Sequence, residues 1–188
     1  MEYLIADLHF GHKKIIEFEP SRRHFSSIEE MDEALIQKWN ETVHYNDIVY
    51  ILGDISMNSK YSYLTAIFSR LKGKKIIIQG NHDNTSDLKK LLRDGYIDAY
   101  HELGIRLKRN KQKLYLSHYP MFIGRRKNMW SVHGHIHSLP SVEPNQLNVG
   151  VDASFMKDTM GLDFGEPILL DALVDYMVAH PVPLYPRR

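Results

Sequence analysis

Three short apolar runs in the first half of the chain each end directly in polar residues. The runs are Tyr3–Ala6, Asp47–Leu52 and Lys74–Gln79. Between and after them, apolar residues recur at helical spacing, which predicts helices over 28–41, 64–71 and 87–92. Strands that alternate with helices at this spacing are typical of parallel βαβ units, whose strands are buried on both faces.

The second half of the chain has a different pattern, with short strands and few helical segments. Gly104–Asn110 and Gln112–His118 predict a hairpin, Met129–His137, Leu147–Asp152 and Pro167–Leu170 predict further strands, and Leu170–His180 predicts a helix that ends before Pro181. The proline-rich tail 181–188 is expected to be extended. A parallel half followed by an antiparallel half indicates an α/β (α+β) fold, a four-layer αββα sandwich of two mixed sheets flanked by helices. At 188 residues the chain is expected to form one domain over 1–188.

Carboxylate, imidazole and amide side chains, all of which can bind metal ions, follow these strand-like runs. In a parallel α/β sheet the carboxyl ends of the strands face one edge, where ligands bind, so these side chains are expected to converge. The chain has no cysteine, so a metal site here must use oxygen and imidazole ligands. The residues in question are Asp7, His9, Asp54, Asn81, His82, Asp83, His118, His135 and His137.

Any one of the acids or the asparagine could simply form a turn, because Asp and Asn are common at strand ends. Together with four histidines in register, they favour a metal site. Even seven of these nine side chains would exceed the ligands that one catalytic ion needs, and seven would suffice for two ions that share a carboxylate. Two ions about 3.5–4 Å apart can hold both the attacking and the leaving oxygen of a phosphoryl displacement.

The pattern resembles the calcineurin-like metallophosphoesterases, and most closely their small phage and bacterial members. Five ordered motifs carry the resemblance: Asp7-x-His9, Gly53-Asp54, Gly80-Asn81-His82-Asp83, His118, and Gly134-His135-x-His137. The resemblance implies one metal held by Asp7, His9, Asp54 and His137, and a second held by Asp54, Asn81, His118 and His135. It also implies hydrolysis of a phosphate ester by a hydroxide that bridges the two metals. Manganese is the expected metal, with iron, zinc and nickel as alternatives.

The resemblance further implies catalytic roles for His82 and Asp83. His82 would contact the phosphate and protonate the leaving oxygen, and Asp83 would orient and charge its imidazole. Outside the motifs, four residues are candidates for substrate contact: His12, Tyr119, Arg125 and Arg126. The alternative for His12 is packing of the first loop, and the alternative for the arginines is a solvated basic face.

The net charge of +1 provides no general attraction for nucleic acid, so no stable nucleic-acid complex is expected. The expected partner is a small phosphate ester, either a phosphodiester or a nucleotide. The N-terminus lacks a signal-peptide pattern and no apolar stretch approaches a membrane span, which favours the cytoplasm. The alternative functions are a phosphomonoesterase or protein phosphatase, and a non-catalytic scaffold that binds a protein partner. The oligomeric state is left open.

Overall fold

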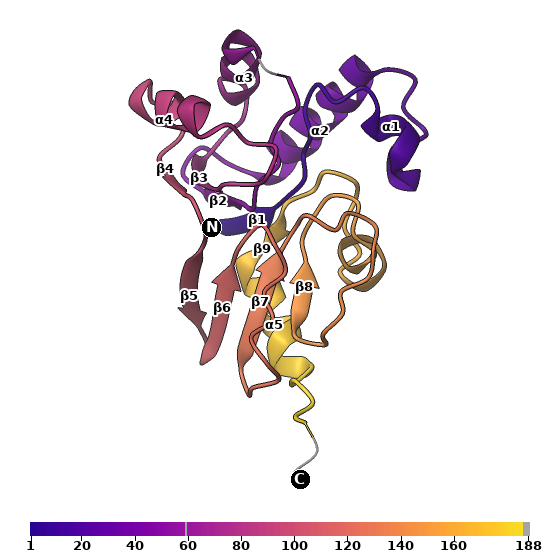
Figure 1. Cartoon of the computed structure of the whole chain (residues 1–188), viewed down its shortest axis with the longest axis vertical. Helices are drawn as coiled ribbons and strands as arrows, with labels where there is room; N and C mark the ends of the chain where they lie inside the picture. The colour runs from indigo at the N-terminus through magenta and orange to yellow at the C-terminus, as the bar shows by residue number, and fades with distance from the viewer. Residues whose placement is uncertain (59, 186–188) are drawn as a thin grey trace.

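A computed structural model of the chain describes residues 1–58 and 60–185, and it contains two sheets (Figure 1). The first sheet has the order β4-β3-β2-β1-β9. Its strands β1 to β4 are parallel, and β9 pairs with β1 in the antiparallel direction. The strands are β1 (Glu2–Ile5), β2 (Ile48–Ile51), β3 (Lys74–Ile78), β4 (Ala99–His101) and β9 (Ile168–Leu169).

The second sheet has the order β5-β6-β7-β8, and it is also mixed. Its strands are β5 (Ile105–Arg109), β6 (Gln112–Leu116), β7 (Met129–His133) and β8 (Gln146–Asn148). The hairpin β5–β6 is antiparallel as predicted, but β6, β7 and β8 are parallel to one another. The expectation of an antiparallel second half is therefore wrong for these strands. The loops 117–128 and 134–145 are long enough to return the chain to the starting end of the sheet, as a parallel connection requires.

Helices flank the sheets, and the expected ones form close to their predicted bounds. In α2, Ser27 caps the N-terminus by accepting a hydrogen bond from the Glu30 N–H at 3.1 Å. The short helices α1, η1 and η2 and the strand β4 were not predicted. The helices are α1 (Ile15–Phe18), η1 (Pro20–Arg22), α2 (Ile28–Thr42), α3 (Tyr61–Phe68), α4 (Thr85–Arg93), η2 (Phe155–Thr159) and α5 (Leu170–Ala179).

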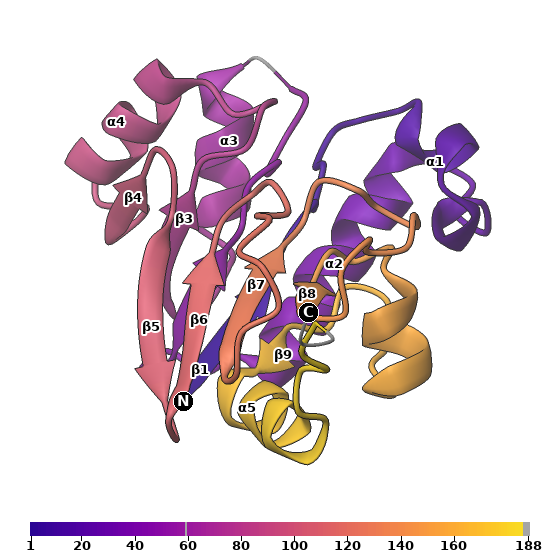
Figure 2. The ribbon, with the colours of Figure 1, turned by 60° about the horizontal axis from the view of Figure 1, so that its bottom comes forward.

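Two apolar cores follow from the alternation of side chains along the parallel strands. In β1, Ile5 faces the core formed with helices α2, α3 and α4, whereas Leu4 faces the second sheet. The second core joins Leu4 to Leu116 of β6 and Leu173 of α5. Both faces of β1 are thus buried, which explains its continuous apolar sequence. Two mixed sheets flanked by helices are confirmed (Figure 2).

The carboxyl ends of β1, β2, β6 and β7 are hydrogen-bonded to one another beyond the last strand residues. The Asp7 N–H donates to the Gly53 carbonyl, and the Gly134 N–H donates to the His118 carbonyl, each at 3.1 Å. Across the two sheets, the His118 Nδ1 lies 2.8 Å from the Leu52 carbonyl, so their polar loops meet at one common edge. Of the predicted tail, residues 186–188 lie outside the described part. Within the described residues, no helix is long and apolar enough to cross a membrane.

Candidate metal centre

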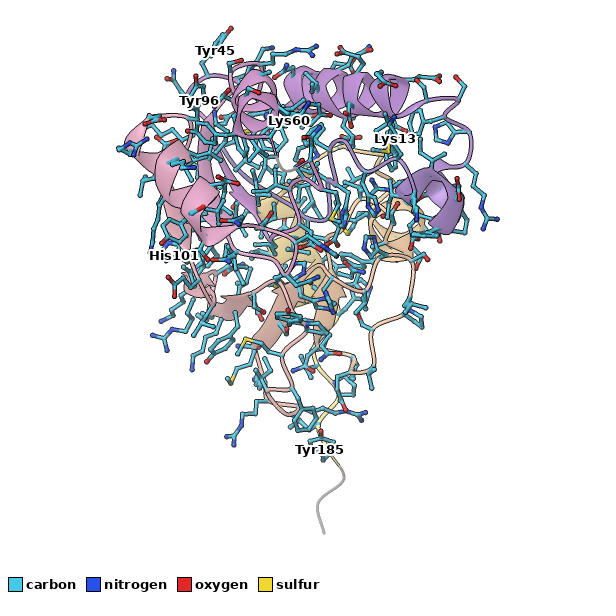
Figure 3. All side chains as sticks on the ribbon, turned by 45° about the horizontal axis from the view of Figure 1, so that its top comes forward. Lys13, Tyr45, Lys60, Tyr96, His101 and Tyr185 are labelled. Atoms are coloured by element: carbon cyan, nitrogen blue, oxygen red, sulfur yellow. The ribbon has the colours of Figure 1, made fainter. Side chains whose placement is uncertain are left out.

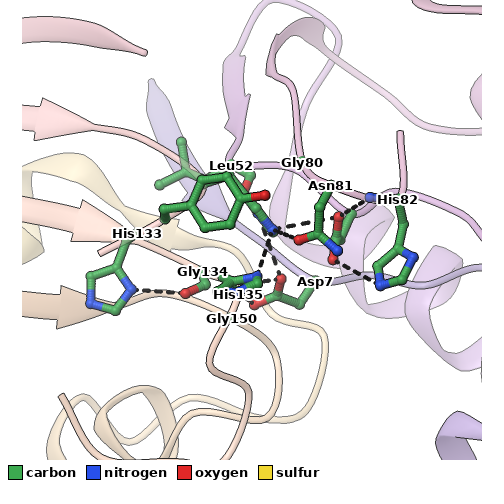
Figure 4. Close-up of polar contacts among 12 residues, drawn as sticks. Asp7, Leu52, Gly80, Asn81, His82, His133, Gly134, His135 and Gly150 are labelled. Atoms are coloured by element: carbon green, nitrogen blue, oxygen red, sulfur yellow. Dashed lines mark hydrogen bonds and ion pairs between the residues drawn. The ribbon is translucent and has the colours of Figure 1, made fainter. Parts of the chain in front are cut away.

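The edge between the two sheets brings six of the seven predicted ligands into two compact groups. In each group, the ligand atoms lie within 4.8 Å of one another. Each group combines residues from different motifs, so neither group can form without the tertiary fold. Asp7 and His135, one residue from each group, lie side by side in Figure 4. The first group is Asp7, His9 and His137, and the second is Asp54, His118 and His135.

The Asp54 carboxylate lies between the two groups. Its Oδ2 is 3.5 Å from Nε2 of His9, and its Oδ1 is 3.5 Å from Nε2 of His118. Each oxygen thus faces a different group, and the side chain is almost fully buried. This is the arrangement that a carboxylate shared by two cations requires.

In the second group, the possible ligand atoms of Asn81, His118 and His135 point toward one position. The Asn81 Oδ1 and the His135 Nδ1 lie 2.8 Å and 3.2 Å from Nε2 of His118. The His118 Nδ1 is 2.8 Å from the Leu52 carbonyl, which can only accept a hydrogen bond. The His118 proton is therefore on Nδ1, and Nε2 presents a lone pair to this point.

Both ring nitrogens of His9 are buried without a hydrogen-bond partner among the described residues. Buried polar atoms are nearly always paired, so an unpaired imidazole beside two carboxylates fits a metal ligand. Burial, aided by the positive charge of Arg22, lowers the pKa of His9 to about 2 and keeps the ring neutral. A neutral imidazole is the form that binds metal. The residues present thus fit divalent cations.

A buried ion pair that the sequence analysis missed supports the first group from behind. Arg22 donates to both oxygens of Asp152, at 2.9 Å and 2.8 Å, and also to the backbone carbonyls of Asp7 and Leu8. Asp152 also accepts from His137 Nδ1 at 3.0 Å. Although burial opposes ionisation, the contacts with His137 and Arg22 hold the pKa of Asp152 below its usual range. Asp152 is the last residue of the predicted strand-like run Leu147–Asp152, a signal that could have identified it, whereas Arg22 carried no such signal.

The oxygens of Asp152 also lie near Glu19, and with His137 they form a third group of possible ligands. Arg22 already occupies both oxygens of Asp152, so this group is poorly suited to a further cation. The Glu19 Oε2 is nonetheless buried without a hydrogen-bond partner among the described residues. It thus adds a further unpaired polar atom to the two ring nitrogens of His9 at this edge.

Backbone conformation distinguishes the ligands from the rest of the chain. Eight described residues other than glycine have a positive φ, and five of them are candidate ligands. Such conformations cost roughly 1–3 kcal/mol each and cluster at functional sites. They let neighbouring motif residues turn toward the same edge. The five are Asp7, His9, Asp54, His135 and His137.

Gly80 is required because the backbone passes directly against Asp54. A Cβ at Gly80 would lie 2.2 Å from the Asp54 Oδ1 and 2.4 Å from its backbone nitrogen. No other residue type fits this position without displacing the shared carboxylate. Gly80 thus allows the backbone to approach Asp54 closely, in addition to allowing the turn at the end of β3.

His82 stands at the mouth of the site and is 40% exposed. Its backbone N–H donates to the Asp54 Oδ1 at 2.9 Å, and its ring Nε2 lies 3.9 Å from Oδ2 of the same carboxylate. Its ring centre is 5.4 Å from that of His9. His82 is thus next to both groups and open to solvent, as a residue that meets substrate must be.

Asp83 does not contact the His82 ring, and the role expected for it is wrong in this respect. Its carboxylate accepts hydrogen bonds from the backbone N–H groups of Asp54, Ile55 and Gly80, at 2.8–2.9 Å. Burial raises the pKa of this carboxyl group. The side chain points back into the loops because three backbone donors otherwise lack partners there. Asp83 therefore joins the second and third motifs and acts on the site through Asp54.

Two of the four substrate candidates lie at the site. His12 has a buried Nδ1 without a hydrogen-bond partner among the described residues, and its ring centre is 5.4 Å from that of His9. The Tyr119 ring lies 5.1 Å and 4.6 Å from the rings of His118 and His135, and it is 53% exposed. Both side chains thus border the histidines of the two ligand groups.

Arg125 and Arg126 do not reach the site. They precede β7, whereas His135 follows it, and five strand residues span roughly 16 Å. Arg125 forms an ion pair with Glu143 at 2.8 Å and packs over the ring of Tyr185. Figure 3 shows Tyr185 at the opposite end of the molecule from Lys13, the residue after His12. The expectation of substrate contact is therefore wrong for these two arginines.

Comparisons with known proteins identify relatives that match most of the chain. A protein described as uncharacterized, from Methanocaldococcus jannaschii, is 29% identical, over 92% of this chain and 88% of its own. The gene 66 protein of Mycobacterium phage L5 is 31% identical, over 80% of this chain and 86% of its own.

Structural comparison supports the same fold. The crystal structure of a protein of unknown function from Aquifex aeolicus superposes with a TM-score of 0.69 at 24% identity. The match covers 94% of this chain and 98% of the other. The sequence profile described as "Calcineurin-like phosphoesterase" matches residues 3–179. Family membership together with the His and Asp groups supports a metal-dependent phosphoester hydrolase. The chain therefore belongs to the calcineurin-like phosphoesterase family.

Proposed function

We propose that the protein hydrolyses a small phosphodiester or a nucleotide with the help of two divalent metal ions. The observation that carries this proposal is the position of Asp54, whose two oxygens each lie 3.5 Å from a histidine of a different group. A single ion would leave one of these groups without a cation. Two ions that share Asp54 match both groups at once.

Asp7, His9, Asp54 and His137 would hold one ion, and Asp54, Asn81, His118 and His135 the other. Oxygen and imidazole ligands suit manganese, and they also accept iron, zinc or nickel. When bound, a pair of such ions lowers the pKa of water and neutralises charge on the phosphoryl group. The backbone contacts of Asp83 and the pair Arg22–Asp152 keep the ligands in place.

In this proposal His82 donates a proton to the oxygen that leaves phosphorus. Its ring is beside the Asp54 carboxylate, yet 40% exposed, so it can face an ester bound over the metal centre. A positioned general acid of this kind contributes about 10²- to 10⁴-fold to the rate. His12 and Tyr119 would line the sides of the same opening.

A pocket beside His82 offers room for the organic part of the ester. It has a volume of about 340 Å³ and is lined by apolar and polar residues, including Met57, Asn58, Leu88 and Asn84. This size matches the small end of ligand pockets. A compact diester is therefore favoured over a phosphoprotein, which would need a broad docking surface.

Hydrolysis of bis(p-nitrophenyl) phosphate and p-nitrophenyl phosphate by metal-stripped protein tests the proposal. Manganese, iron, zinc and nickel are added separately, and bound metal is counted by elemental analysis. We expect two metals per chain and faster turnover of the diester. Faster turnover of the monoester would support a phosphomonoesterase or protein phosphatase. No turnover with any metal, from folded protein, would support the non-catalytic scaffold.

A further inference from the structure

The net charge of the chain is near zero, but its charges are unevenly distributed. Residues 103–149, which form the second sheet and its loops, contain eight Lys and Arg residues and a single acid, Glu143. The whole chain has 24 basic and 23 acidic residues, so the remainder is net acidic. The argument from net charge against a nucleic-acid partner therefore does not apply to this part of the molecule.

Three of these basic residues share the outer face of the second sheet. Arg106 and Lys108 of β5 and Lys113 of β6 are exposed. Lys108 lies directly opposite Lys113 in the antiparallel register, an arrangement that destabilises a sheet. Among residues 1–58 and 60–185, Arg109 and Arg125 form ion pairs, but these three side chains form none. The face therefore carries unneutralised positive charge.

Protection of a sheet edge explains only part of this cluster. Lysines on edge strands prevent pairing with other chains, and β5 is an edge strand. Lys113, however, lies on β6, which is paired on both sides by β5 and β7. Protection of the sheet edge does not require a lysine on β6, whereas binding of a polyanionic ligand to this face would use one.

A groove lies beside Arg106 of this basic face, where β5 begins and β6 ends. It has a volume of about 260 Å³, and its walls include Arg106, Tyr115 and Met121. Tyr115 lies opposite Arg106 in the register and three residues before His118. The Met121 N–H donates to the Ser131 Oγ at 2.9 Å, which ties the loop after β6 to β7 (Figure 2). The groove thus adjoins the end of β6, two residues before the proposed metal ligand His118.

We propose that the outer face of β5 and β6 binds the phosphate backbone of a single-stranded nucleic acid and leads it to the metal centre. The cations of Arg106, Lys108 and Lys113 contact phosphates, and the ring of Tyr115 offers a surface on which a base can stack. The proposal rests on the proposed diesterase function and extends its substrate from a small diester to the diesters of a strand.

Binding of fluorescent oligo(dT) of about 20 nucleotides, followed by anisotropy in EDTA, tests this face without catalysis. The variant R106Q/K108Q/K113Q is compared with wild type and with K74Q/K89Q/K157Q. The control removes three exposed lysines that lie outside β5 and β6. We expect the face variant to bind at least about tenfold more weakly, with the control unchanged. The slope of log affinity against log salt should fall by about 2, because each lost contact removes about 0.7 for single strands.

Two further measurements separate the possible outcomes. Turnover of bis(p-nitrophenyl) phosphate by the face variant should equal that of wild type, since none of its substitutions touches the metal centre. If the protein binds the oligonucleotide but hydrolyses neither phosphate ester, the proposed binding face is supported and the proposed hydrolase function is contradicted. Equal affinity of the face and control variants, or no wild-type binding at 50 mM salt, would overturn the proposal. Binding to vesicles of anionic lipid in place of oligo(dT) would also overturn it.

Discussion

The Asp152 Oδ2 accepts a hydrogen bond from the His137 Nδ1 at 3.0 Å, and this contact leaves the other ring nitrogen free for a metal. Asp152→Asn should weaken metal binding at the first group by about 10- to 100-fold, the usual effect of removing such a partner. It should also destabilise the metal-free fold by about 3–5 kcal/mol, because Arg22 loses its buried counterion. Isothermal titration of manganese and urea unfolding in EDTA measure the two effects.

Asp158→Asn is the matched control for this substitution, since Asp158 is an exposed acid a few residues further along. It should leave both quantities unchanged. Equal manganese affinity in Asp152→Asn and wild type would show that His137 needs no partner to bind metal.

Asp83→Asn should loosen the junction of the second and third motifs. An amide nitrogen cannot accept, so at least one of the three backbone N–H groups that Asp83 binds loses its acceptor, at about 1–3 kcal/mol. Urea unfolding measures the loss, and elemental analysis should show reduced metal because Asp54 shifts. Asp87→Asn, on helix α4, is the control and should match wild type. A rate defect with full stability and full metal would instead indicate a direct role for Asp83 in catalysis.

His82→Ala should keep metal binding and lower turnover of the diester by about 10²- to 10⁴-fold. The side chain is 40% exposed and stands outside both ligand groups, so its removal leaves their donor atoms in place. Single-turnover rates and metal content measured on one preparation provide the comparison. His44→Ala removes an exposed histidine elsewhere and should have no effect. Loss of bound metal from His82→Ala would make His82 a ligand.

Asp54→Asn should lower metal occupancy at both groups, because each carboxylate oxygen faces a different group. An amide presents only one oxygen, so the variant should bind fewer than two metals per chain. Elemental analysis after gel filtration gives the stoichiometry. Two tightly bound metals in this variant would rule out a shared carboxylate.

His133 provides a pH test within the second sheet, at the end of β7 and two residues before the proposed ligand His135. It is fully buried, its Nδ1 lies 2.8 Å from the Gly134 carbonyl, and burial lowers its pKa to about 4. The unfolded chain binds the proton first, near pH 6.5, so the stability from neutral His133 is present above that pH and is lost as the pH falls toward 4.

His133→Asn should therefore flatten the decline of stability between pH 6.5 and pH 4 by about 1.4 kcal/mol per pH unit. Urea unfolding of both proteins in EDTA at pH 5 and pH 7 measures the difference. Parallel stability curves for the two proteins would contradict the lowered pKa.

Local sequence patterns were sufficient for β1, β2 and β3 of the first sheet and for helices α2, α3 and α4. Apolar runs such as Lys74–Gln79 and the helical spacing behind Ser27 depend on neighbours in sequence, and they appear in the structure as β3 and α2. The direction of β6, β7 and β8 could not be read in this way. It depends on the path of long loops, which carry no periodic signal.

The same division applies to the site. The residue types, their order and the strand ends that they follow could be predicted from the sequence, because ligand chemistry and turns are local properties. The fold was needed to show that Asp83 binds backbone, that Arg125 lies far from the metal centre, and that Arg22 and Asp152 support His137. It also gathered basic residues on one sheet face of a nearly neutral chain. Most of these relations join residues from different strands and loops, which are brought together only when the chain folds.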